Sequence, residues 1–78
     1  MKDEHRYSVV LEPQDGGGFT VTVPALPEVV TEGESESEAL AMAEEAIRLV
    51  LDYRRDNGLP LPPDLPPAIR TVTVAAAE

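Results

Sequence analysis

The sequence predicts an α+β fold: a small antiparallel sheet in the order strand, strand, strand, helix, strand, with one helix packed on one face. Three observations predict this fold. Short segments on either side of a glycine-rich loop alternate apolar and polar residues, as strands with one buried face do. One longer segment has helical periodicity and clearly marked ends. The chain has 78 residues, which is enough for a single domain.

The N-terminal part of the chain predicts a β-hairpin. Residues 5–12 form the first expected strand, and residues 19–23 form the second. Between them, residues 13–18 contain an aspartate and three glycines, which supply the backbone conformations of a hairpin loop. Two prolines then end the second strand, because proline lacks a backbone donor. We expect a short third strand over residues 29–31.

Residues 35–57 are predicted to form the only helix. Ser35 and Glu38 have the spacing of a capping box, in which each side chain accepts a hydrogen bond from a free backbone amide at the helix start. Asn57 and Gly58 mark the end, because glycine readily adopts the left-handed conformation that follows many helices.

The apolar face of this helix is wider than one sheet can cover. Its apolar side chains sweep about 200°, whereas a helix on a single sheet needs a stripe of little more than about 100°. We therefore expect part of this face to contact a second copy of the chain, most simply in a dimer. The residues assigned to this oligomer interface are Met42, Leu49 and Tyr53.

Residues 58–67 are too rich in proline for a helix or a central strand. They predict a stiff, extended connection that returns the chain to the sheet. The less favoured alternative is a ligand for a proline-recognising domain. Residues 68–75 then predict the last strand.

Composition limits the class of protein. There are no cysteines, so disulfides and thiolate metal sites are excluded, and a reducing compartment is favoured. We find no signal peptide pattern, and no apolar run approaches the roughly 20 residues that cross a bilayer. We therefore expect one cytoplasmic domain over residues 1–78, with no membrane contact.

The acidic charge is unevenly distributed. The net charge is −9, and no lysine or arginine occurs between Arg6 and Arg48. This argues against direct binding of nucleic acid, which requires clustered basic residues. The acidic surface serves either solubility or the docking of a basic partner. The residues assigned to partner binding are Glu28, Glu32, Glu34 and Glu36.

The sequence contains no convincing catalytic pattern. His5 is the only histidine, and it has no neighbouring second ligand or nucleophile. Residues 16–18 lack the Lys-Ser/Thr of a phosphate-binding loop and precede a strand. The alternating glutamates lack the other ligands of a calcium loop. We expect no enzyme activity, no metal and no cofactor.

Several short motifs, in this order and spacing, resemble the N-terminal domain of the HicB antitoxin family, the partner of the HicA mRNA-cleaving toxin. The resemblance spans residues 7 to about 74. Glu28 stands where the family often has glycine. The motifs are Tyr7 to Leu11, Gly17-Gly18-Phe19-Thr20-Val21, Pro24-Ala25-Leu26-Pro27, Thr31-Glu32-Gly33, Glu38-Ala39 and Gly58-Leu59-Pro60-Leu61-Pro62.

The resemblance implies a partly RNase H-like sheet with one helix that acts by covering a toxin rather than by catalysis. We expect a module that neutralises a small, basic, HicA-like toxin by covering its active or RNA-binding face. The alternative is a stand-alone homo-oligomeric domain with a structural or small-ligand role. Because the sequence stops at Glu78, we expect no C-terminal DNA-binding domain.

Overall fold

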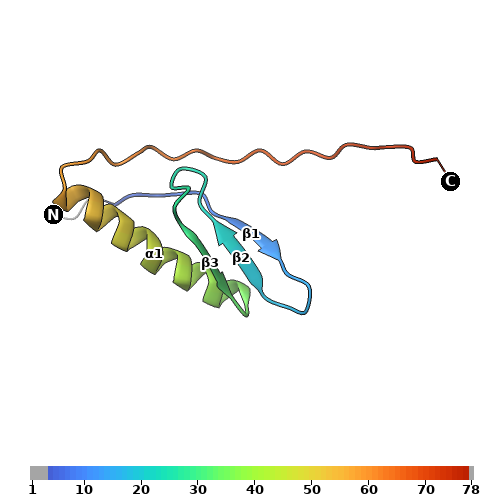
Figure 1. Cartoon of the computed structure of the whole chain (residues 1–78), viewed down its shortest axis with the longest axis horizontal. Helices are drawn as coiled ribbons and strands as arrows, with labels where there is room; N and C mark the ends of the chain where they lie inside the picture. The colour runs from blue at the N-terminus through green and yellow to red at the C-terminus, as the bar shows by residue number, and fades with distance from the viewer. Residues whose placement is uncertain (1–3, 78) are drawn as a thin grey trace.

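The computed structural model describes residues 4–77, which form a three-stranded sheet and one helix (Figure 1). This confirms the predicted α+β class. The elements, in chain order, are β1 (Val10–Pro13), β2 (Phe19–Thr22), β3 (Val30–Gly33) and α1 (Glu36–Asp56).

The three strands form an antiparallel meander in the order β1-β2-β3. Leu11 of β1 is opposite Val21 of β2, which is opposite Thr31 of β3. Because side chains alternate along each strand, Val21 points toward the helix, and Thr20 and Thr22 lie on the other face. The predicted alternation of buried and exposed residues is therefore confirmed.

β1 begins at Val10 rather than at the predicted residue 5. Val10 is paired with Thr22, so residues before Val10 would need partners after the end of β2. There the chain turns at Pro24, which has no backbone N–H to donate. The ladder therefore ends, and residues 5–9 continue without a strand partner.

The helix ends are those that the sequence predicts. Ser35 is the N-cap, and its hydroxyl accepts a hydrogen bond from the Glu38 N–H at 3.1 Å. The Glu38 carboxylate accepts one from the Glu34 N–H, one residue earlier than in the standard capping box. Asn57 is the C-cap, and Gly58 follows with a φ of 67°.

The core consists of two small clusters between the helix and the sheet. Val21 packs with Ala39 and Ala43 near the start of α1. Leu26 lies in the turn before β3 and packs in a second cluster, together with half-buried residues from the second half of α1. Small residues at the first cluster let the helix approach the sheet closely.

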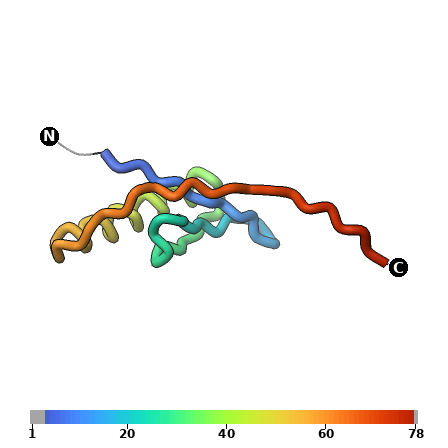
Figure 2. Tube along the Cα trace, turned by 90° about the horizontal axis from the view of Figure 1, so that it is seen from above, coloured from blue at the N-terminus to red at the C-terminus, as the bar shows by residue number. Residues whose placement is uncertain are grey.

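The predicted last strand does not form. Residues 59–77 have no helix or strand, and every residue of 68–77, here called the tail, is exposed. Figures 1 and 2 show that the chain passes the N-terminal segment and then leaves the body. The Cα radius of gyration is 15.8 Å, compared with about 11.5 Å for a compact domain of this length.

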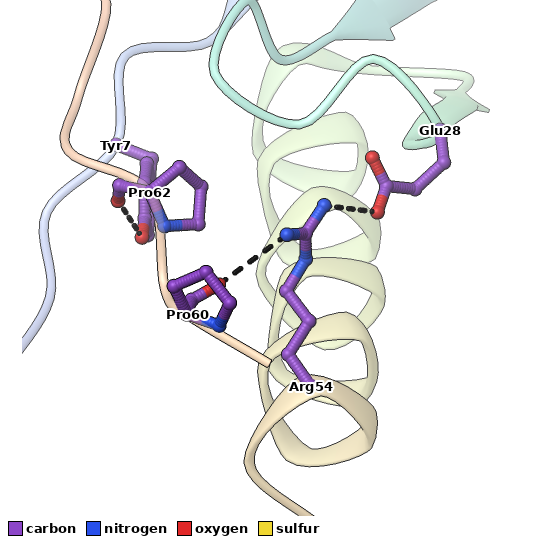
Figure 3. A network of polar contacts seen from close by, with 5 residues as sticks. All are labelled: Tyr7, Glu28, Arg54, Pro60 and Pro62. Atoms are coloured by element: carbon purple, nitrogen blue, oxygen red, sulfur yellow. Dashed lines mark hydrogen bonds and ion pairs between the residues drawn. The ribbon is translucent and has the colours of Figure 1, made fainter. Parts of the chain in front are cut away.

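The proline-rich segment, residues 58–67, is fixed to the N-terminal segment before the tail begins. The Tyr7 hydroxyl donates a hydrogen bond to the Pro62 carbonyl at 2.6 Å (Figure 3). The N–H and hydroxyl of Ser8 both donate to the Asp64 carboxylate at 2.8 Å. These contacts hold the proline-rich segment against the N-terminal segment. The chain then runs past the sheet, whereas the sequence predicted that it would return to the sheet as a strand.

Gly33 allows the helix to approach β3, and its replacement should destabilise the fold. A Cβ at this position would lie 2.4 Å from the Ala39 backbone nitrogen. We expect Gly33→Ala to lower the free energy of unfolding by about 1–3 kcal/mol, measured by urea denaturation. Val30→Ala on the same strand, at a site 65% exposed, should change it by less than about 1 kcal/mol. Equal stability of both variants would contradict this packing.

Docking of the proline-rich segment should weaken in acid. The pKa of Asp64 lies below its ordinary value because the Ser8 N–H and then the Ser8 hydroxyl donate to the carboxylate. Because the folded-state pKa is lowered, the ionised carboxylate stabilises docking at every pH above the ordinary pKa of an aspartate. This contribution is lost as the pH falls through the folded-state value, below about pH 4.

Amide hydrogen exchange of Ser8, followed by NMR through an acid titration, measures this effect. Asp64→Asn should remove the pH dependence, whereas Asp52→Asn on the outer face of α1 should leave it unchanged. Unchanged protection of the Ser8 amide in the Asp64→Asn variant would contradict the assignment.

Candidate functional site

The candidate site is an open hollow of about 290 Å³ at the end of the sheet where α1 begins. It lies between the β1–β2 loop, the end of β3 and the first turn of the helix. Its lining is polar and acidic. The residues that line it are Gln14, Gly17, Gly18, Glu32, Gly33, Glu34 and Glu38.

Two glycines in the lining of the hollow lie against each other, Gly18 in the β1–β2 loop and Gly33 at the end of β3. A Cβ on Gly18 would lie 2.9 Å from the carbonyl oxygen of Gly33, so the two backbones are in close contact. Gly18 also has a φ of 88°, which side-chain-bearing residues rarely adopt. Both positions therefore require glycine, and this requirement explains two of the motif glycines at once.

Gln14 connects the hairpin loop to the acidic wall of the hollow. Its side-chain amide donates to the Glu32 carboxylate at 3.2 Å and also to the Thr20 hydroxyl. The loop itself is closed by hydrogen bonds between Gln14 and the glycines 17 and 18. Glu32 is thus held on the sheet surface beside the loop.

The hollow is lined by three glutamates and by no basic side chain. Glu32, Glu34 and Glu38 are exposed, and the lining contains no lysine or arginine. Glu36 is also exposed and occupies the first turn of α1, next to this group. The structure therefore brings together Glu32 and Glu34 in the hollow and places Glu36 beside them. The arrangement presents a concentrated negative field at one end of the domain.

Glu28, the fourth glutamate predicted to bind a partner, lies apart from the hollow. It accepts a hydrogen bond from the Arg54 guanidinium at 2.9 Å, near the other end of α1 (Figure 3). Arg54 also donates to the Pro60 carbonyl, so it joins the turn before β3 to the proline-rich segment. The pKa of Glu28 is lowered, first by a backbone hydrogen bond and then by Arg54.

One flank of α1 is apolar and exposed. Leu49 and Tyr53 are each 64% exposed, and Met42 is exposed as well. The prediction that the sheet leaves part of the apolar face of the helix uncovered is confirmed. Whether this flank is an oligomer interface stays a prediction.

Sequence reasoning missed two residues of the hollow and, away from the hollow, the ion pair that holds Glu28. Glu38 was assigned only to the helix cap, and Gln14 only to the loop. The hairpin register would have located Gln14, because it follows the strand pair that ends with Pro13 and Phe19. The Arg54–Glu28 pair joins segments far apart in sequence, and no local pattern signals it.

Within residues 4–77, no group of three or more His, Cys, Asp and Glu side chains is arranged to hold a metal ion. His5 is exposed. In the same range, no helix has the length and apolar composition to span a bilayer. The fold and the site define a small acidic α+β domain that exposes carboxylates, one flank of its helix and an extended tail.

Comparison with known proteins identifies the family. Residues 7–75 match the model of the HicB-like antitoxins of bacterial toxin–antitoxin systems. This match covers most of the chain, and the chain belongs to that family.

Curated relatives include both longer and similar-sized proteins. The chain is 44% identical over 59 residues to Antitoxin HicB 1 of Photorhabdus laumondii and 42% identical over 62 residues to Antitoxin HicB of Escherichia coli K12. These matches cover 73% and 77% of this chain but only 38% and 45% of the relatives. UPF0150 protein Ta0767 of Thermoplasma acidophilum is 34% identical over 59 residues, which cover 76% of this chain and 86% of that protein. The chain thus spans less than half the length of the two antitoxins.

Proposed function

We propose that this domain neutralises a small, basic, HicA-like toxin that cleaves mRNA, by covering its active or RNA-binding face. Membership of the HicB-like antitoxin family carries this proposal. The proposed role is binding and not catalysis, and it operates in the cytoplasm, where mRNA is translated.

The acidic hollow is the surface that we propose for toxin docking. A protein that cleaves RNA must attract phosphates, so its working face is expected to be basic. Glu32, Glu34 and Glu36 lie together at one end of the domain and present the complementary charge. Complementary charges mainly accelerate association and disfavour wrong partners.

Lasting contact requires more than charge. β3 is an edge strand of the sheet, and its end lies beside the hollow. An edge strand offers unpaired backbone groups to an incoming strand. We therefore place the toxin against the β3 edge and the hollow together, with Glu28 outside the main contact.

Neutralising the glutamates at the hollow should slow toxin association. We expect Glu32→Gln, Glu34→Gln and Glu36→Gln together to lower the association rate about tenfold at low salt and to flatten its salt dependence. Dissociation should change less. The toxin for this test is any small basic protein that is recovered with this chain from the native host, and stopped-flow kinetics over a range of salt measures both rates.

A matched variant separates local charge from net charge. Glu44→Gln, Glu45→Gln and Asp52→Asn remove the same charge from the outer, exposed face of α1. Equal slowing by both triple variants would refute docking at the hollow. Recovery of no partner from the native host, together with no rescue of cells expressing any adjacent small basic gene product, would refute the antitoxin role and favour the stand-alone oligomer.

A further inference from the structure

The tail carries a strand sequence that is buried elsewhere in the same chain. Residues 71–74 read Thr-Val-Thr-Val, the same four residues as 20–23 in and just after β2. Val21 in β2 and Val23 just after it are buried, at 0% and 1% exposure. In the tail the two valines are 80% and 78% exposed. The tail therefore has the composition of a sheet strand but no sheet around it.

The tail cannot pair with β1 of its own chain, because most of it lies beyond the end of that strand. Ser8 is hydrogen bonded to Asp64, and the two segments run in the same direction, since Tyr7 contacts Pro62. At about 3.3 Å per residue, the chain from Ser8 to Pro13 spans about 17 Å and that from Asp64 to Ala75 about 36 Å. Most of the tail thus lies beyond the end of β1.

The C-terminal residues that lie alongside β1 are unsuited to pairing with it. By the same spacing these include Pro66 and Pro67, which have no N–H to donate to a ladder. The fixed contacts at Tyr7 and Ser8 prevent the segment from slipping back along β1. The failure of the last strand to form within the chain follows from this register.

The outer edge of β1 is an open strand edge. In the described sheet β1 pairs only with β2. On the helix-facing side, Val9 just before β1 and Leu11 within it pack against the core but are only half-buried. An added strand with Val72 and Val74 on this side would cover them, and its threonines would lie on the outer face beside Val10 and Glu12 of β1.

We propose that the tail of each chain adds to the free β1 edge of a second copy, in a reciprocal exchange that closes a twofold dimer. The proposal goes beyond toxin binding and does not depend on it. It assigns the sheet a fourth strand, which is supplied by the other copy.

Charge favours a second copy over the toxin as the acceptor of the tail. The chain has a net charge of −9, yet its residues 65–77 contain no aspartate or glutamate and one arginine, Arg70. A strand with this charge suits an acidic body, and β1 itself carries the exposed Glu12. A basic toxin would gain nothing from Arg70 and is better matched by the hollow.

Isotope-filtered NMR on a mixture of differently labelled full-length copies tests the exchange directly. We expect cross-copy NOEs between residues 71–74 and residues 9–12, and a dimer mass by sedimentation at micromolar concentration. The same NOEs within one copy and a monomer mass would overturn the proposal in favour of an ordinary fourth strand. A monomer whose tail amides become protected only when toxin is added would overturn it in favour of the toxin.

Two adjacent substitutions provide a matched pair, because neighbouring strand residues face opposite sides of a sheet. Val72→Asp places a charge on the covered side and should weaken dimerisation at least about tenfold. Thr71→Asp adds the same charge on the outer face and should weaken it less than about threefold. Both residues are exposed in the single chain, so circular dichroism should show unchanged folding.

A third substitution tests the competing interface on the helix. Leu49→Asp lies on the exposed apolar flank of α1. Strand exchange predicts a smaller effect for Leu49→Asp than for Val72→Asp. Dissociation by Leu49→Asp with no effect of Val72→Asp would show that the dimer forms through the helix, and the strand exchange would be wrong.

Discussion

The contact between Gly33 and Ala39 is the constraint on which the fold depends. With no side chain at Gly33, the backbone of β3 lies directly against the start of α1. This proximity lets residues as small as Ala39 and Ala43 fill the space above Val21. It also brings Glu34 and Glu38 to the hollow, because both lie within a turn of the contact. The packing requirement and the acidic surface therefore have one structural origin.

The path of the C-terminal residues depends on a second set of contacts, at Tyr7 and Ser8. These polar contacts fix the proline-rich segment in one register against the N-terminal segment. Proline restricts φ, so a short fixed stretch sets the direction of the residues that follow. Arg54 supports the same arrangement from the helix end through its bond to Pro60. The Glu28 side chain completes this arrangement by pairing with Arg54.

Local patterns predicted the hairpin, the helix and its caps, because each depends on residues near one another in sequence. Ser35 and Glu38 signal the cap through their spacing alone. The composition of residues 68–75 predicted a strand, but composition carries no information on whether an edge lies within reach. The hollow was only partly predictable for the same reason. The acidic stretch was visible, whereas the approach of Gln14 to Glu32 and the separation of Glu28 depend on the folded register.

The two edges of the sheet differ in ways that suit different partners. The β1 edge is bordered by half-buried apolar side chains, and the β3 edge ends at the acidic hollow. A strand of the chain's own composition, apolar on one side and free of acidic residues, matches the first edge. A basic protein matches the second. If both are occupied as we propose, exchange at β1 leaves the β3 edge open, and the twofold axis gives each dimer two equivalent acidic hollows. Toxin binding and self-association would then be compatible, because they use opposite edges of the same three strands.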